Sequence, residues 1–195
     1  MQNIFGDSVF DEMILNQALN NRNIQFIEEF TRESVYKAIY LMERIETLDD
    51  EEDIPMEERK PITITINSYG GTVYDCLAWV SIIERLIERG YDIKTHIQGV
   101  GMSCGFVIPL CGTHRTMNRY STIMCHQIST GGYGTIQDLK EGQEESERLW
   151  KVFKQIIIKN TKITDEQLEN IRTRKFDWYM DAETAFELGV IDEIV

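Results

Sequence analysis

The sequence predicts a single α/β domain, because strand-like and helix-like segments alternate along its 195 residues. Ile62, Ile64 and Ile66 alternate with threonines, as in a strand, and the segment that follows has apolar residues at helical spacing. Glycine-rich segments at residues 67–71 and 99–105 follow two of the predicted strands. Short connections between strand, helix and strand predict a parallel, right-handed crossover, so both glycine segments should lie at the same edge of the sheet.

The composition excludes several classes of protein. The chain is 42% hydrophobic and 27% charged, as in ordinary globular domains, and its length suits one domain with a sizeable core. Its net charge of -13 disfavours nucleic acids and anionic membrane surfaces, which would repel it. We find neither a targeting segment nor an apolar run long enough to span a bilayer, so we expect a cytoplasmic protein with no membrane partner.

The cysteines lie in apolar surroundings and lack the paired spacing of a zinc site. We therefore expect free, buried thiols in a reducing compartment and no bound metal. The four residues are Cys76, Cys104, Cys111 and Cys125.

The first half of the chain begins with residues 1–22, which form an arm or a small helix against a partner; we assign no element because the apolar residues have no regular period. A short strand over residues 24–27 precedes a helix that Thr31 caps and that ends near Thr47. Residues 49–60 read DDEEDIPMEERK, and this charged, proline-containing run predicts a solvated loop. After the isoleucine strand, a helix begins at about residue 72 and ends at Gly90, and a strand follows over residues 91–99. The apolar residues expected on the inward face of this helix are Val73, Leu77, Val80, Ile83 and Ile87.

The second half begins with a short apolar helix over residues 104–111 that should be buried on all sides. Residues 115–118 should lead through a turn to a strand over residues 122–125. Residues 135–159 predict a long helix that is polar early and apolar late, which is typical of a projecting element that meets another subunit. A capping box at Thr164 starts the next helix, and residues 176–179 form a link to a last helix over residues 181–188.

Ser103 is the candidate nucleophile. It stands in the pentapeptide Gly-Met-Ser-Cys-Gly at residues 101–105, which has the G-x-S-x-G spacing of a nucleophile elbow. The alternative is a structural role, in which a serine at the start of a helix caps the backbone of that helix.

A serine nucleophile needs a base and usually an acid that orients the base. His126 ends a predicted strand and is the best candidate base, since His96 lies inside an alternating strand and His114 stands next to a cationic neighbour. No acid lies between Ser103 and His126 and no histidine follows His126, which excludes the residue order of the α/β-hydrolases.

The acid must therefore follow His126. Asp177 stands between aromatic residues in a link between helices, where a carboxylate could be held away from water. From position alone the other acids of this region stay open, namely the glutamates of the long helix and Asp138, Asp165, Asp181 and Asp192.

Four segments carry a resemblance to a known family. They read ITINSYGG at residues 64–71, GMSCG at 101–105, MCHQ at 124–127 followed by a glycine pair, and MDAETAFELGVID at 180–192. In this order they resemble the proteolytic subunit of the Clp protease, a serine peptidase of the Clp/crotonase fold, over residues 23–195. The resemblance implies one peptidase domain built as a repeated β-β-α superhelix, with a projecting handle helix and strand over residues 129–160.

The chain also departs from the pattern of this family. The family usually has proline before the paired glycines and proline after His-Gln, where this chain has Tyr69 and Ile128. Residues 49–60 look inserted.

The resemblance implies a role for each site residue. The nucleophile falls on Ser103, the base on His126 and the acid on Asp177. The oxyanion hole falls on the backbone N–H groups of Gly71 and Cys104, and the handle strand that pairs with substrate backbone falls on Gly131 and Gly132.

The resemblance also implies an assembly. Homo-oligomers of this family stack two heptameric rings into a tetradecamer, and an AAA+ Clp unfoldase feeds unfolded polypeptides into the chamber. ATP is used only by that partner, so this subunit should need no cofactor. Three other functions stay open: a non-catalytic ring subunit or scaffold, a crotonase-fold enzyme that acts on acyl thioesters, and a phage-type protease of capsid maturation.

Overall fold

The computed structural model of the protein describes residues 9–129 and 131–195. The first eight residues of the expected arm lie outside the described residues, and the rest of the arm forms a helix. In chain order, the elements are α1 (Val9–Asn21), β1 (Asn23–Phe26), α2 (Arg32–Glu51), the 3₁₀ helix η1 (Met56–Glu58), β2 (Ile62–Ser68), α3 (Val73–Glu88), β3 (Ile93–Met102), α4 (Cys104–Leu110), β4 (His114–Met117), β5 (Thr122–Cys125), α5 (Ile136–Asn160), α6 (Asp165–Arg174), β6 (Trp178–Met180), α7 (Ala182–Glu187) and β7 (Glu193–Ile194).

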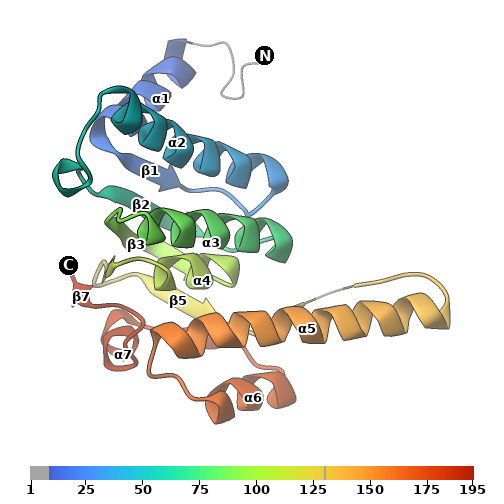
Figure 1. The fold of residues 1–195 in the computed structure, drawn as a ribbon. Coiled ribbons are helices and arrows are strands. Elements are labelled where there is room, and N and C mark those ends of the chain that lie inside the picture. Colours follow the sequence, from blue (N-terminus) through green and yellow to red (C-terminus); the bar gives the residue numbers. More distant parts are fainter. Residues whose placement is uncertain (1–8, 130) are drawn as a thin grey trace.

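The strands of the described residues form one sheet, as expected for an α/β fold. Its main path has the order β1-β2-β3-β4-β7, and all of these neighbours are parallel. β5 pairs in parallel with the last part of β3 and antiparallel with β6. Helices α2, α3, α4 and α5 follow one another down one side of the molecule, each in contact with the next (Figure 1). This arrangement agrees with the expected Clp/crotonase-like fold.

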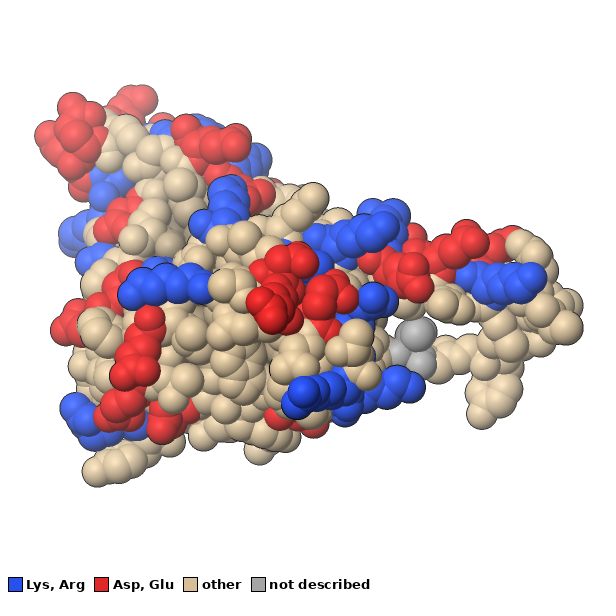
Figure 2. Space-filling view, turned by 90° about the horizontal axis from the view of Figure 1, so that it is seen from below, with Lys and Arg blue, Asp and Glu red and all other residues tan. Residues whose placement is uncertain are grey.

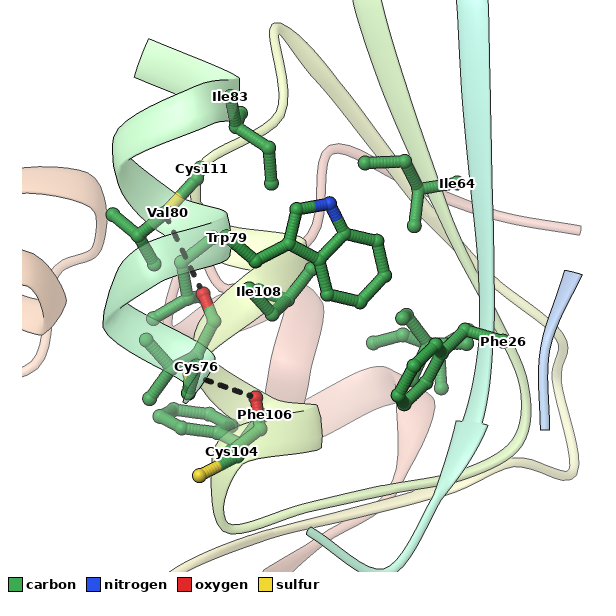
Figure 3. Packing of buried hydrophobic residues seen from close by; sticks show 14 of the residues in the cluster. Phe26, Ile64, Cys76, Trp79, Val80, Ile83, Cys104, Phe106, Ile108 and Cys111 are labelled. Atoms are coloured by element: carbon green, nitrogen blue, oxygen red, sulfur yellow. Dashed lines mark hydrogen bonds between the residues drawn. The ribbon is translucent and has the colours of Figure 1, made fainter. Parts of the chain in front are cut away.

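The core centres on Trp79, which is fully buried between α3 and the sheet. Its ring lies 4.9 Å from that of Phe26 and 5.9 Å from that of Phe30 (Figure 3). The indole N–H donates to the sulfur of Met42 at 3.1 Å, so the polar atom of this large side chain is satisfied inside the core. The alternating isoleucines of β2 are fully buried and complete the packing.

The predicted inward stripe of α3 was only partly right. Val80 and Ile83 are buried, but the other buried positions are Cys76, Trp79 and Leu86, while the predicted Val73, Leu77 and Ile87 are only half-buried. Both sets have helical spacing, so periodicity alone does not choose between them. The face is set by the contact of the large Trp79 ring with the sheet.

The expected solvated loop at residues 49–60 is partly wrong. Helix α2 continues to Glu51, beyond the predicted end near Thr47. Asp49 is only 3% exposed, and its carboxylate accepts two hydrogen bonds from the Arg22 guanidinium, at 2.7 and 2.9 Å, and one from the Tyr91 hydroxyl at 3.1 Å. These partners stand far away in the sequence, so composition did not indicate that the acidic run would be ordered.

Three strand boundaries also differ from expectation. β3 continues to Met102, so part of the second glycine segment is strand. Residues 115–118, for which no strand was expected, lie largely in β4, which pairs with β3. The link at residues 176–179 contains the start of β6. Short strands of this kind are defined by their partners more than by their own residues.

Helix α5 projects from the body, as its polar first half predicts (Figure 1). Thr135 caps it in a capping box with Asp138, and all of its buried residues, from Leu149 to Ile157, lie in the second half. The described residues at 129 and 131–133, where the start of the handle was expected, are not assigned to a strand. Seen from below, acidic and basic side chains are interspersed over the body and along the projecting arm (Figure 2).

In the described part of the chain, no helix combines the length and the apolar character needed to cross a membrane.

Candidate active site

Ser103 stands at the junction of β3 and α4. It occupies the N-cap position, but its side chain makes no capping hydrogen bond. Its backbone has φ 55° and ψ -116°, a conformation that L residues rarely adopt and that is typical of a strained turn at a functional site. The capping alternative therefore fails for Ser103, and the elbow geometry is present.

Backbone hydrogen bonds fix this turn. The N–H of Ser103 donates to the carbonyl of Met124 at 3.0 Å, and its carbonyl accepts from Phe106 at 2.9 Å. Met124 lies in β5, two residues before His126. The same contact that fixes the serine therefore also holds the strand that carries the histidine.

The first glycine segment lies against the serine, at the shared edge that the sequence predicts. A Cβ atom on Gly70 would lie 2.6 Å from the Cβ of Ser103 and 3.2 Å from its Oγ, so only glycine fits there. Gly71 has φ 145°, and a Cβ atom at this position would lie 2.4 Å from the carbonyl oxygen of Phe30. We find no hydrogen bond from the N–H of Gly71 or of Cys104 to another described residue.

His126 and Asp177 are brought together by two strands. His126 follows β5 and Asp177 precedes β6, and these strands pair with Cys125 opposite Trp178. The Nδ1 of His126 lies 3.7 Å from Oδ1 of Asp177. The Asp177 side chain is 52% exposed, so the expectation that its aromatic neighbours shield it from water is wrong.

A cavity of about 260 Å³ lies beside Ser103 and His126. These two residues and Gly71 line it together with apolar side chains from α3, α4 and α5. The apolar lining residues on these helices are Val73, Phe106, Val107, Trp150, Phe153 and Ile157. Such a cavity accepts an apolar side chain beside a reactive hydroxyl.

Gly131 and Gly132 line a second, larger cavity of about 690 Å³ between their segment, α5 and α6. Gln127, Ile128 and Trp150 line both cavities, so the two are neighbours along one wall. No sequence feature indicates Trp150 as a residue of the site, because this residue stands in an apolar run without a signal of its own. The glycine pair at residues 70–71 was predicted to lie at this edge, although Gly70 was given no role there.

The other two histidines lie outside this cavity. His96 is in β3, where Nδ1 lies 2.8 Å from the Thr116 hydroxyl and burial lowers its pKa. His114 lies 3.3 Å from Glu193 at the other end of the sheet. His126 is therefore the histidine that the fold brings to Ser103.

The four cysteines are free and buried, as expected. Burial raises the pKa of Cys125 to about 12, so the thiol next to His126 stays protonated. Among the described residues, no three His, Cys, Asp or Glu side chains are grouped so that they could hold a metal ion.

A sheet edge that gathers serine, histidine and aspartate beside a cavity has the arrangement of an enzyme that uses nucleophilic catalysis. Comparison with known families identifies which class of enzyme. The model of the Clp protease family matches residues 8–195, and the chain belongs to this family of peptidases.

Curated relatives agree with this assignment. The chain is 30% identical to the ATP-dependent Clp protease proteolytic subunit 1 of Prochlorococcus marinus subsp. pastoris, a match that covers 97% of this chain and 90% of the relative. It is 33% identical to the ATP-dependent Clp protease proteolytic subunit of Porphyromonas gingivalis, over 70% of this chain and 60% of the relative. It is 30% identical to the proteolytic subunit 3 of Rhodococcus jostii, over 71% and 67% respectively.

Proposed function

We propose that the protein is a serine endopeptidase with Ser103 as nucleophile, His126 as base and Asp177 as the acid that orients the base. The observation that carries this proposal is the placement of Ser103. It has a strained backbone and no capping bond, and it lines one cavity with a histidine that faces an aspartate 3.7 Å away.

In this mechanism the Ser103 hydroxyl attacks the carbonyl carbon of a peptide bond while His126 takes the hydroxyl proton. The carbonyl oxygen gains negative charge, which the N–H groups of Gly71 and Cys104 stabilise. His126 then gives its proton to the departing amine, and an acyl-enzyme remains. Water, deprotonated by His126, hydrolyses the ester and restores the serine.

Asp177 contributes through His126 Nδ1. A carboxylate there selects the tautomer with the proton on Nδ1, which leaves Nε2 as the atom that takes the serine proton. A separation of 3.7 Å is longer than a hydrogen bond, so the working enzyme must bring these two atoms about 0.5 Å closer. The exposed position of Asp177 leaves room for that small movement.

The cavities indicate an extended peptide substrate. The apolar lining beside Ser103 suits an apolar side chain next to the cleaved bond. The Gly131–Gly132 segment presents backbone with little side-chain bulk, and a Cβ atom on Gly131 would have no neighbour within 4 Å. A peptide could pair with this backbone as an added strand.

We further propose that the chain works as a homo-oligomer of stacked heptameric rings, a tetradecamer, that degrades unfolded polypeptides. The ATP-dependent names of the relatives support a partnership with an AAA+ Clp unfoldase that uses the ATP. The first half of α5 presents Ile136 and Leu139, which are 77% and 49% exposed, and such apolar surface suits contact with a second subunit. None of the proposed steps in this subunit requires a cofactor.

A fluorophosphonate probe tests the nucleophile. We expect it to label the wild-type protein and a Ser81→Ala control, whose hydroxyl bonds only within α3 at the Leu77 carbonyl, but not Ser103→Ala. The same samples are tested with a short fluorogenic peptide, with and without an unfoldase, after light scattering has established the assembly. Equal labelling of wild type and Ser103→Ala, or assembled rings that are neither labelled nor active, would overturn the proposal and favour a non-catalytic ring subunit.

A further inference from the structure

The two residues assigned to the oxyanion hole are joined directly by a side chain. The thiol of Cys104 donates to the carbonyl oxygen of Gly71 at 3.4 Å. The Cys104 side chain is fully buried whereas Gly71 is exposed, so this bond is shielded from water on the side of the thiol. The contact connects the start of α4 to the glycine turn that precedes α3.

A second thiol extends this connection. The Cys76 thiol, one turn into α3, donates to the carbonyl oxygen of Cys104 at 3.9 Å (Figure 3). Burial raises the pKa of Cys76 well above its usual value, so this thiol remains a neutral donor. Two thiols therefore link three backbone segments around the serine.

The rest of the Gly71 backbone is held from the opposite side. The Phe30 N–H donates to the Gly70 carbonyl and the Thr72 N–H donates to the Phe30 carbonyl, both at 2.7 Å. The N–H and C=O of a trans peptide point in opposite directions, so the Gly71 N–H points away from Phe30. Phe30 thus orients the peptide plane between Gly70 and Gly71. Phe30 and Cys104 together hold the next plane, between Gly71 and Thr72.

We propose that the Cys104 side chain is a positioning group for catalysis, which keeps the Gly71 N–H at the right distance and angle from the N–H of Cys104 itself. The inference rests on the proposed function, because it assumes that these two N–H groups stabilise an oxyanion. Glycine at φ 145° has no side chain to restrict its rotation, so the turn needs an external contact to fix it. A donor that is displaced by a fraction of an ångström loses part of its stabilisation of the transition state.

Steady-state kinetics on the full-length assembled protein with a fluorogenic peptide test this role. Cys104→Ala should lower kcat about 10-fold with KM within twofold, because the contact serves the transition state and not substrate binding. The rate of fluorophosphonate labelling should fall in parallel. Cys104→Ser, which keeps a donor, should restore at least a third of the wild-type kcat.

Cys111→Ala is the matched control. Cys111 is also a buried thiol of this region, but it donates to the Val107 carbonyl at 3.7 Å, within the same short helical segment, and not to the carbonyl of Gly71. We expect wild-type kcat from this variant. Should Cys104→Ala fail to fold, Cys104→Thr and Cys104→Val replace it, because their side chains have the same shape and only threonine has a donor. We then expect kcat to be about fivefold higher for Cys104→Thr than for Cys104→Val.

Three results would overturn the positioning role. The first is a wild-type kcat in Cys104→Ala. The second is a kcat of Cys104→Ser no higher than that of Cys104→Ala, or a kcat of Cys104→Thr no higher than that of Cys104→Val, and the third is a loss of kcat in Cys111→Ala equal to that in Cys104→Ala. Failure of the proposed function looks different, because the wild-type protein itself would then show no labelling that depends on Ser103.

Discussion

His126 and Asp177 stand opposite each other at the first position beyond the paired strands β5 and β6. The last pair in the register is Cys125 with Trp178, and the next residues in each direction are this histidine and this aspartate. Their side chains meet with Nδ1 and Oδ1 3.7 Å apart. Antiparallel pairing therefore places Asp177 opposite His126, even though the Asp177 side chain is half exposed.

This relationship predicts the effect of removing the carboxylate. Asp177→Asn should lower kcat about 100-fold, because the histidine loses the group that selects its tautomer. The loss should be smaller than that of Ser103→Ala, since a contact of 3.7 Å orients the ring less firmly than a short hydrogen bond. The measurement is kcat for a fluorogenic peptide at neutral pH.

A matched acid provides the control for Asp177. Asp181→Asn changes a nearby carboxylate that accepts from the Thr184 N–H at 2.8 Å and so caps α7, whereas Asp177 lies 3.7 Å from His126. It should retain wild-type kcat. An Asp181→Asn variant as slow as Asp177→Asn, or an Asp177→Asn variant as fast as wild type, would remove Asp177 from the mechanism.

Gly71 is the second position at which a small change should have a large effect. A Cβ atom there would lie 2.4 Å from the Phe30 carbonyl oxygen and 2.7 Å from the Phe30 N, and φ is 145°. Gly71→Ala should destabilise the fold by about 2 kcal/mol and lower kcat at least 100-fold, because the N–H cannot stay in place. Thermal unfolding and peptide cleavage measure the two effects.

Gly142→Ala is the contrasting glycine variant. Gly142 lies inside α5, and a Cβ atom there would have no neighbour within 4 Å. We expect a gain of about 0.5–1 kcal/mol in the free energy of unfolding, since alanine favours a helix more than glycine does. If Gly71→Ala is as stable as Gly142→Ala, the described close approach to Phe30 is wrong.

The sequence predicts the order of the elements and the shared edge of the glycine turns because these depend on local patterns. A local sequence pattern predicts each of three features: the strand β2 from its alternating isoleucines, the turn at residues 70–71 from its glycines, and the turn at Ser103 from the glycines around it. The sequence carried no local signal for the exposure of Asp177. Its neighbour Tyr179 is 57% exposed while Met180 is buried, because successive side chains of a strand point to opposite faces. Aromatic neighbours in sequence therefore do not shield a carboxylate unless the fold places them on the same side.

The ordered acidic segment gives a third prediction. Asp49→Ala should destabilise the protein by about 3 kcal/mol, because Arg22, whose side chain is only 13% exposed, would be left buried without its partner. Glu51→Ala removes an exposed acid 3.4 Å from Arg44 and should cost less than about 0.5 kcal/mol. Urea unfolding of both variants at one protein concentration makes the comparison. If both variants lower the free energy of unfolding equally, Asp49 is not held in a buried ion pair, and the prediction of a solvated loop at residues 49–60 stands.

The last prediction concerns acid stability and rests on Arg115 and Asp192, which join β4 to the end of the chain. The guanidinium donates to both carboxylate oxygens, at 3.0 and 2.6 Å, and the Arg115 N–H adds a bond of 2.8 Å. These bonds, with the side-chain bond from Arg115 as the largest cause, hold the pKa of Asp192 below its ordinary value.

A carboxyl group with a lowered pKa in the folded state stabilises the fold fully above its unfolded pKa of about 4, and this contribution is lost as the pH falls through the folded pKa. Asp192→Asn should therefore lower the free energy of unfolding by about 1 kcal/mol at pH 7, a modest value because the side chain is about one-third exposed. The difference between wild type and variant should shrink below pH 4, as measured by urea unfolding at several pH values. If the difference in free energy of unfolding between wild type and Asp192→Asn stays constant or grows as the pH falls, Arg115 does not stabilise the charged form of Asp192.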